Sequence, residues 1–586
     1  MRSSGILYPI SSLPSAYGIG CFSKEAYEFI DFLYAAGQRY WQVLPFGPTG
    51  YGDSPYQSFS TFAGNPYFIS LEDLIEEGLL EKSECDELYW GTEPEFVDYG
   101  AIYESRFKAL RLAHGRFRET EENNKAYQEF IKKESYWLED YCLFMALKNE
   151  NEGKPWIEWE EPYRIRDKKA MDVAAEVISD EIDFYRFQQF KFMEQWEKIH
   201  DYARKRSVSI IGDIPIYVAF DSADAWSHPE MYQFDEKNVP TAVAGCPPDA
   251  FSATGQLWGN PLYDWAYLKK HKYEWWVRRI SRCYEFYDVI RIDHFRGFDE
   301  YYSVPYGDKT AENGKWEKGP GMDLFSTLRK ELGDVDIIAE DLGYITDSVR
   351  ELLEKSGFPG MKVLQFAFDE SESSSYLPYN HITNCVVYTG THDNMTTRGW
   401  IDDISDHDRD FVRRYINSLY TDYGQFTWDF IREAFRSVAD LAIVPIQDFL
   451  VKGNEARMNC PAVGVGNWQW RVKPDTLSRE LADSILAMTK LYGRYHYAPI
   501  VEDEVEEEES EAEAGSEAGA GSGVEAGSEE GAGSGTEAGG EEGAGSGTKA
   551  GSDAKAGSEA GVGSGSKVGI GSVGGAGASA AAEKSV

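Results

Sequence analysis

Five acidic residues follow short apolar runs in this 586-residue sequence: Asp213 in IIGDIP, Asp293 in VIRIDHF, Glu340 in DIIAEDLG, Asp393 in YTGTHDN and Asp448 in VPIQD. One acid after a strand usually caps a helix or solvates a loop. Several acids that meet at one place can do more, because paired carboxylates serve as nucleophile and general acid. Whether they meet depends on the elements that carry them.

Eight Val-, Ile- and Leu-rich runs are typical of buried parallel strands, and most are separated by amphipathic helical stretches. This alternation predicts an α/β fold, a (β/α)8 TIM barrel. Catalytic groups of such a barrel lie at the C-terminal ends of its strands, so we expect these acids to converge. For Asp448, a helix cap or a loop-solvating acid is the alternative. The predicted strands are residues 6–11, 40–45, 207–213, 287–293, 335–341, 361–366, 385–391 and 441–447.

The spacing of these runs also predicts large, mainly helical insertions on the catalytic face, because loops at that face tolerate growth. One insertion is expected at about 47–205, with long helical runs at 125–150 and 182–206, and another at about 214–270. The predicted catalytic domain is residues 1–500. Residues 501–586 are acidic, rich in Gly, Ala, Ser and Glu, and free of aromatic residues, so we expect a disordered C-terminal tail. A docking arm is the alternative for this tail.

Composition excludes several classes of protein. The formal net charge of -42 argues against nucleic acid or an anionic membrane as partner. Residues 1–15 lack a signal pattern, and no apolar stretch of about 18 residues occurs. The seven cysteines are scattered without a CxxC motif, which favours reduced thiols in a cytoplasmic protein over a disulfide framework or zinc site. No phosphate-binding glycine motif or calcium loop is found, so no cofactor and no metal are expected.

The combination of acids fits the chemistry of retaining glycoside cleavage. One carboxylate attacks the anomeric carbon, and a second acid about 5–5.5 Å away protonates the leaving oxygen. Arg291 lies two residues before Asp293 and faces the same barrel interior by strand alternation, so it can keep that aspartate ionised. His294 alone would more often be a packed, hydrogen-bonded histidine.

Ordered motifs then give a resemblance to a known family. The strings RIDHFRGF (291–298), AEDLG (339–343) and THDN (391–394) resemble three catalytic regions of the alpha-amylase superfamily. Narrower blocks resemble the amylomaltase, or 4-alpha-glucanotransferase (disproportionating enzyme), family across residues 1–500. These blocks are SSGILYPISSLPS (3–15), WQVLPFGPTGYGDSPYQSF (41–59), GDIPIYV (212–218), CPPDAFS (246–252), GQLWGN (255–260) and EARMN (455–459).

The resemblance implies a 4-alpha-glucanotransferase that moves alpha-1,4-glucan segments between maltooligosaccharides or glucans by double displacement with retention. It identifies Asp293 as the nucleophile, Glu340 as the general acid/base and Asp393 as a binder of the donor sugar's hydroxyls. We expect the charge of Asp293 to raise the pKa of Glu340. The substrate-binding residues that it implies are Ser54, Tyr56, Asp213, Asp249, Phe251, Trp258, Arg291, His294, His392 and Asn459.

Transfer requires that an acceptor sugar, and not water, opens the intermediate. The resemblance assigns residues 244–252 (AGCPPDAFS) to a lid over the acceptor, while composition alone equally permits a proline-stiffened turn with Phe251 in the core. The family commonly has an aromatic residue at Ala250 and an aliphatic residue at Cys246, so more hydrolysis is expected here. Tyr51 resembles a residue of a remote glucan-binding groove. A retaining hydrolase and a catalytically dead glucan-binding barrel remain alternatives, although all three carboxylates are present.

Overall fold

The computed structural model describes residues 2–50, 52–119, 124–248, 252–343, 345–368, 374–419, 422–461 and 463–496. The predicted tail at 501–586 and the lid residues Asp249, Ala250 and Phe251 lie outside the described residues, as does Tyr51. None of the helices in the described ranges is both long and apolar enough to cross a membrane.

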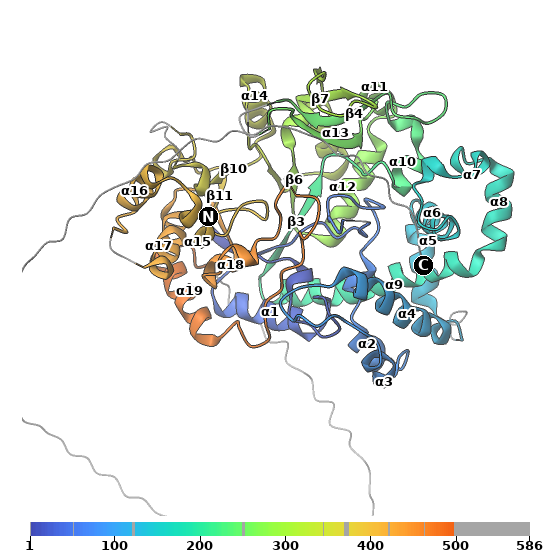
Figure 1. The fold of residues 1–586 in the computed structure, drawn as a ribbon, viewed down its shortest axis with the longest axis horizontal. Coiled ribbons are helices and arrows are strands. Elements are labelled where there is room, and N and C mark those ends of the chain that lie inside the picture. The colour runs from blue at the N-terminus through green and yellow to red at the C-terminus, as the bar shows by residue number, and fades with distance from the viewer. Residues whose placement is uncertain are drawn as a thin grey trace, which may run out of the picture. The chain divides into compact units, whose positions relative to one another are not determined.

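Eight parallel strands form a closed barrel in the order β1-β12-β11-β10-β9-β6-β3-β2, which confirms the predicted fold class (Figure 1). Each predicted strand overlaps one strand of this barrel. The strands are β1 Ser3–Leu7, β2 Tyr40–Gln42, β3 Ser209–Pro215, β6 Val289–Asp293, β9 Ile337–Ala339, β10 Gly360–Val363, β11 Cys385–Tyr388 and β12 Leu441–Pro445.

The first strand differs most from its predicted bounds of 6–11. Pro9 has no N–H for the strand ladder and begins the short 3-10 helix Ile10–Ser12, so β1 ends at Leu7. The last main-chain bond of this edge runs from the N–H of Tyr8 to the carbonyl of Gln42 at 2.9 Å. The apolar run therefore continues beyond the strand because it remains buried, not because it remains extended.

Inward-facing side chains fill the barrel, and a larger core lies between the strands and the surrounding helices. Ile211, Ile338, Val363, Val386 and Ile443 belong to one buried cluster inside the barrel. Alternation along a strand places every second side chain there. On β3, Ile211 and Asp213 therefore share the inner side, and this positions the acid at the strand end.

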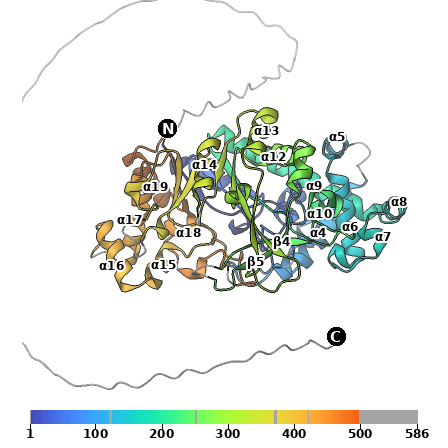
Figure 2. The same cartoon turned by 90° about the horizontal axis from the view of Figure 1, so that it is seen from above.

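In the described residues between β2 and β3 there are eight α-helices. In two views α4 to α8 gather on one side of the barrel, with α15 to α17 on the opposite side (Figures 1 and 2). The predicted helical run at 125–150 is broken at residues 135–137, where the N–H of Trp137 turns back to the carbonyl of Glu134. The helices are α2 Leu71–Glu76, α3 Lys82–Asp86, α4 Tyr99–Phe117, α5 Lys125–Glu134, α6 Leu138–Glu150, α7 Glu161–Arg164, α8 Lys168–Val177 and α9 Ser179–Lys205.

A four-stranded antiparallel sheet in the order β5-β4-β7-β8 was not predicted from the sequence. It combines β4 Ala242–Cys246 and β5 Gln256–Pro261, from the connection after β3, with β7 Glu300–Pro305 and β8 Lys315–Lys318, from the connection after β6. These connections leave the C-terminal ends of adjacent barrel strands, so the sheet adjoins the mouth of the barrel.

The other α-helices of the described residues mostly lie in the connections between successive barrel strands. They are α1 Lys24–Ala35, α10 Ala223–Ser227, α11 Trp265–Lys270, α12 Glu274–Phe286, α13 Met322–Leu332, α14 Asp347–Ser356, α15 Thr397–Asp403, α16 Asp406–Tyr415, α17 Tyr423–Arg436, α18 Ile446–Phe449 and α19 Arg479–Leu491.

Candidate active site

The ends of β3 and β6 bring together two acids and one arginine. These strands are neighbours, with Asp213 opposite Arg291 and Pro215 opposite Asp293 in the register. Arg291 donates from Nη1 to Asp213 Oδ2 at 2.6 Å and from Nη2 to Asp293 Oδ1 at 3.0 Å. The exposed fractions of Asp213 and Arg291 are only 0% and 3%, so this arginine is a buried bridge between the two carboxylates.

Burial and charge act in opposite directions on this bridge. Burial lowers the pKa of Arg291, but Asp213 and Asp293 outweigh it and hold the pKa well above its usual value. Burial raises the pKa of Asp293, as do the charges of Asp213 and Asp393, while Arg291 and His392 lower it. The net direction is upward, and Arg291 is the largest influence that favours the ionised form a nucleophile needs.

Glu340 directly follows β9, the neighbour of β6. Its Oε2 accepts the main-chain N–H of His294 at 2.7 Å, and its Oε1 accepts that of Leu342 at 2.7 Å. His294 has a left-handed backbone, with φ of 57°, and in this conformation its N–H reaches Glu340. The acid is therefore hydrogen-bonded to the residue that follows Asp293.

The pKa of Glu340 is raised to about 8, first by burial and then by the charge of Asp293. Arg291 and the two main-chain N–H donors oppose this shift without cancelling it. The sequence predicts the direction of this shift from the charge of Asp293, but burial is the larger cause. Glu340 is therefore mostly protonated at neutral pH, the state that a general acid requires.

Asp393 lies after β11 and is held in the ionised state. Its Oδ1 accepts Asn459 Nδ2 at 2.6 Å and lies 3.4 Å from His392 Nε2. Burial raises the pKa of Asp393, but His392, Asn459 and Arg291 outweigh it and move the pKa below its usual range. The pKa of His392 is raised because Asp393 outweighs burial. Since 42% of the Asp393 side chain is exposed, it can still reach a ligand.

Tyr56 enters the site from the loop after β2. Its hydroxyl donates to Asp213 Oδ2 at 2.8 Å, and its ring stacks on His392 with centroids 5.1 Å apart. Trp468 contacts both rings at 5.9 Å, so the three form one aromatic wall. Trp468 was missed in the sequence, where a tryptophan in the glycine-rich string GVGNWQW was the only signal.

Trp258 and His294 form a second aromatic contact near the acids. Trp258 lies on β5, and its ring meets the imidazole of His294 edge to face at 4.8 Å. Burial, and to a lesser extent Arg296, lowers the pKa of His294 to about 3, so this imidazole is neutral. A side chain of the four-stranded sheet, Trp258, thus contacts His294, the residue that follows Asp293.

Ser54 and Asp448, which the sequence also singled out, make hydrogen bonds within the protein. Ser54 Oγ accepts the main-chain N–H of Tyr56 at 3.3 Å, which supports the loop, and no contact links it to the three carboxylates. Asp448 is buried and accepts the hydroxyl of Thr389 at 2.6 Å and the main-chain N–H of Thr397 at 2.7 Å. Asp448 therefore does not join the acids in the pocket.

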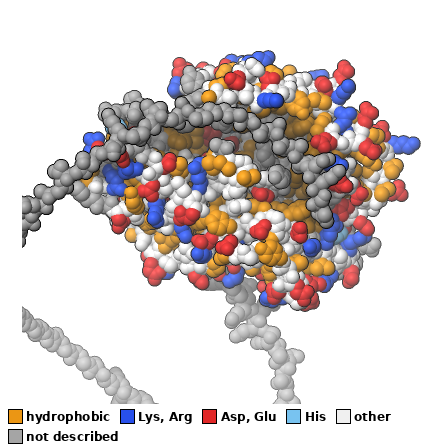
Figure 3. Space-filling model, viewed as in Figure 1, with side chains coloured by type: hydrophobic (Ala, Val, Ile, Leu, Met, Phe, Trp, Pro, Cys, Tyr) orange, Lys and Arg blue, Asp and Glu red, His pale blue; other side chains and the backbone are white. Residues whose placement is uncertain are grey.

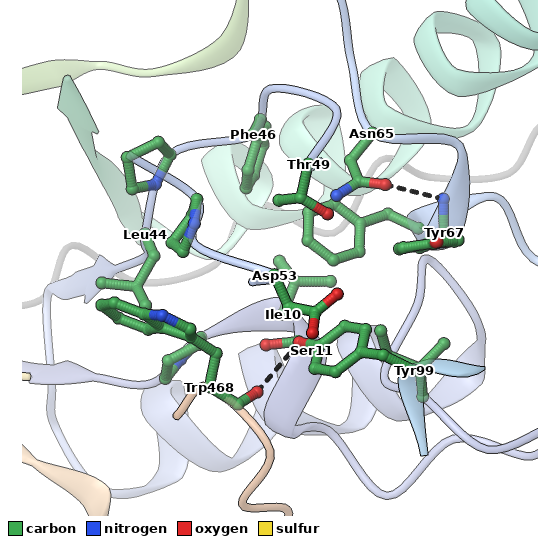
Figure 4. A pocket seen from close by; sticks show the side chains of 15 residues that line it. Ile10, Ser11, Leu44, Phe46, Thr49, Asp53, Asn65, Tyr67, Tyr99 and Trp468 are labelled. Carbon is green, nitrogen blue, oxygen red and sulfur yellow. Dashed lines mark hydrogen bonds between the residues drawn. The ribbon is translucent and has the colours of Figure 1, made fainter. Parts of the chain in front are cut away.

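Small cavities in the described part of the chain adjoin this group. A cavity of about 40 Å³ is lined by Tyr56 and Asp213 among others. Another, of about 30 Å³, is lined by Trp468, Tyr99 and Asp53, and none of the three carboxylates lines it. Figure 4 shows Asp53 in this cavity, with the Tyr99 hydroxyl bonded to the carbonyl of Trp468 at 2.9 Å. Burial raises the pKa of Asp53 to about 6.

The arrangement provides the groups for acid/base and nucleophilic chemistry without an evident metal centre. Within the described ranges, no cluster of three or more His, Cys, Asp or Glu side chains is arranged to hold a metal ion. The site instead has two carboxyl groups with raised pKa values, Glu340 and Asp293, of which Asp293 is paired with a buried arginine, and one ionised carboxylate beside a histidine. Aromatic rings that can stack on sugar faces line two sides.

Comparisons with known proteins give a consistent result. A family model described as 4-alpha-glucanotransferase matches residues 8–478. The chain is 48% identical over 487 residues to a 4-alpha-glucanotransferase of Clostridium butyricum, covering 83% of this chain and 99% of that protein. It is 45% identical to one of Thermus thermophilus over 496 residues, covering 83% and 98%.

A solved structure is also similar over the same part of the chain. The amylomaltase of Streptococcus agalactiae in complex with acarbose aligns with a TM-score of 0.83 and 38% identity, covering 85% of this chain and 100% of that one. The amylomaltase of Corynebacterium glutamicum, with a TM-score of 0.65 and 19% identity, shows the same fold.

Proposed function

The chain belongs to the 4-alpha-glucanotransferase family, and from this premise we propose how its own residues carry out the transfer of alpha-1,4-glucan segments. The observation that carries the proposal is the hydrogen bond from buried Arg291 to Asp293, next to an acid with a raised pKa. This acid, Glu340, accepts a hydrogen bond from the main chain of His294, the residue after Asp293. The reaction retains the anomeric configuration through two successive displacements.

In the first displacement, Asp293 attacks the anomeric carbon of the donor and the glycosidic C–O bond breaks. Glu340 gives its proton to the departing 4-oxygen, so the leaving segment departs as an alcohol. Arg291 favours the ionised nucleophile, and the raised pKa of Glu340 keeps the acid protonated. The two groups thus begin in opposite protonation states, as this step requires.

In the second displacement, ionised Glu340 takes the proton of an acceptor 4-hydroxyl. The acceptor oxygen then attacks the anomeric carbon and displaces Asp293, which returns both carboxyl groups to their initial states. The main-chain N–H groups of His294 and Leu342 stabilise Glu340 while it is ionised between the two steps. Because each displacement inverts the centre, the product keeps the configuration of the donor.

Asp393, His392 and Tyr56 hold the donor sugar beside Asp293. We assign Asp393 to the sugar hydroxyls because it is ionised, partly exposed and fixed on one oxygen by Asn459. The stacked rings of Tyr56 and His392, which belong to the aromatic wall, lie against the same sugar. Trp258 and neutral His294 line another side.

Asp249 and Phe251 complete the acceptor side in this proposal, as the lid that excludes water while the intermediate waits. Support comes from their neighbours: β4 ends at Cys246 and β5 begins at Gln256, so residues 247–255 connect two strands of one sheet, and residues 244–246 of the expected lid belong to β4. Trp258 lies on the second of these strands. The lid is therefore attached to the element that contacts His294.

We assign maltooligosaccharides and starch- or glycogen-like alpha-1,4-glucans as substrates, and the cytoplasm as the compartment. These substrates are uncharged, so the acidity of the chain requires no ionic partner. Acidic and basic side chains are interspersed on the face shown in Figure 3, unlike the basic patch of a nucleic-acid binder. The proposed chemistry uses groups of the chain itself and needs no cofactor.

Incubation with maltotriose tests the substrate assignment against a retaining hydrolase. Transfer predicts glucose together with a ladder of maltooligosaccharides longer than maltotriose, in amounts that conserve the number of glycosidic bonds. Hydrolysis predicts only shorter products and a steady rise in reducing ends. A product mixture without longer chains would contradict the proposed function.

A further inference from the structure

Arg457 lies behind Asp393, in the segment after α18. It follows the 3-10 helix Asn454–Ala456. Its guanidinium donates from Nη2 to the main-chain oxygen of Asp393 at 2.7 Å and from Nε to that of Asn459 at 2.7 Å. Asp393 lies in the connection after β11, and Arg457 and Asn459 lie in the segment after β12 and α18, so one planar group joins these two segments.

Asn459 makes the complementary contacts. Its side-chain Nδ2 donates to Asp393 Oδ1 at 2.6 Å, and its main-chain N–H donates to the carbonyl of His392 at 3.1 Å. Arg457 and Asn459 together form what we call the Arg457–Asn459 clasp. The clasp holds the main chain of Asp393 through one residue and its carboxylate through the other.

The segment that carries the clasp is itself anchored. Ala456 is fully buried, and its carbonyl accepts Gln447 Nε2 at 3.2 Å. Met458 is 2% exposed, and its carbonyl accepts the main-chain N–H of Trp468 at 2.7 Å. Arg457 therefore extends from a backbone held on both sides, which allows it to fix the position of Asp393 rather than follow it.

We propose that Arg457 is a positioning residue for the transfer reaction, which sets the orientation of Asp393 toward the donor sugar. This inference rests on the proposed role of Asp393. A group that binds a distorted sugar must be held within about 0.5 Å of its productive position. Misplacement weakens the transition state more than the ground state, so kcat falls more than KM rises. A lysine cannot replace the planar two-donor contact of arginine.

The test compares Arg457→Ala and Arg457→Lys in the full chain, with kcat and KM for maltotriose and the melting temperature measured for each. We expect kcat of Arg457→Ala to fall about a hundredfold while KM changes less than about threefold. Arg457→Lys keeps the positive charge but can keep only one of the two hydrogen bonds. We therefore expect its kcat to fall about tenfold. If the alanine variant does not fold, a wild-type kcat in the lysine variant overturns the proposal.

A matched control is Arg409→Ala. Arg409 also donates to main-chain oxygens, those of Ile401 at 2.9 Å and Ile404 at 3.0 Å, but on α16 and without contact to the three carboxylates. A purely structural arginine lowers the melting temperature and leaves kcat per folded molecule unchanged. If Arg457→Ala behaves in this way, the proposal is wrong.

Two further variants separate this inference from the proposed function. The activity of Asn459→Ala is compared with that of the double variant Arg457→Ala/Asn459→Ala. Because both residues act through Asp393, the fold-loss of the double variant should be smaller than the product of the two single fold-losses. Losses that multiply would overturn the clasp. Asp393→Asn tests the underlying role: near-wild-type turnover there refutes the role of Asp393. An inactive Asp393→Asn beside a fully active Arg457→Ala refutes only the role of Arg457.

Discussion

The alkaline side of the pH–rate profile reports the acid/base directly. Glu340 must be protonated to cleave the donor, and its pKa is about 8. A group with this pKa is about 90% protonated at pH 7 and about 10% protonated at pH 9. We therefore expect kcat/KM for maltotriose to fall about tenfold between these two pH values. On the acid side, activity falls as Asp293 becomes protonated.

Activity falls as the pH rises because the protonated form of Glu340 is the one that cleaves the donor. Burial and Asp293 raise the pKa of Glu340, so the protonated acid persists to higher pH than an exposed glutamate would allow. With an unperturbed pKa of about 4.3, less than about 1% of the acid would be protonated at pH 7. The free energy behind the shift is about 5 kcal/mol at about 1.4 kcal/mol per pKa unit.

The assay measures initial rates of maltotriose disproportionation in constant ionic strength between about pH 5 and pH 10. A matched donor with a 4-nitrophenol leaving group provides the control, because a good leaving group departs without a proton. The rate of 4-nitrophenol release should therefore not fall at alkaline pH. An alkaline limb below about pH 6 with maltotriose, or an identical limb with both donors, would refute the role of Glu340.

Three other perturbations test the surrounding contacts. Tyr56→Phe removes the hydroxyl that donates to Asp213, so the free energy of unfolding should fall by about 1 kcal/mol in urea denaturation; an unchanged midpoint would contradict this contact. Asp213→Asn leaves Arg291 with one charged partner and should lower the free energy of unfolding by about 3 kcal/mol, with a lower kcat; wild-type stability would count against the buried bridge. Deletion after Val501 should leave kcat and KM unchanged for short and long glucans, and a large rise in KM for long glucans would refute this.

The barrel could be predicted because its strands are buried on both faces and therefore appear as short apolar runs. The convergence of Asp213, Asp293, Glu340 and Asp393 could be predicted as well, since the C-terminal ends of barrel strands meet at one face. Asp448 follows a strand in the same way but is bonded to Thr389 and Thr397 instead. The predicted strand bounds were less accurate where the chain stays buried but is no longer extended. This happens at Pro9, where a 3-10 helix begins inside an apolar run. The antiparallel sheet was missed because its four strands come from two separate connections and pair only in three dimensions.

The site was predicted where one strand or one turn carries the signal, and missed where contacts are long-range. Arg291 and Asp293 share a strand, so alternation indicates that both face inward. Trp468 reaches Tyr56 from a loop about four hundred residues away, and Arg457 acts on the main chain of Asp393. No local pattern encodes such contacts. The dominance of burial in the pKa of Glu340 likewise depends on the folded surroundings.

The identity of the nucleophile is the claim on which the mechanism depends. In Glu340→Gln, the second displacement lacks its base, so an activated donor such as a maltotriosyl fluoride should leave the glycosyl group attached to the enzyme. Mass spectrometry of the intact protein should show one added maltotriosyl group, and peptide mapping should place it on Asp293. An adduct on Asp213 or Asp393, or none despite release of fluoride, would contradict the account.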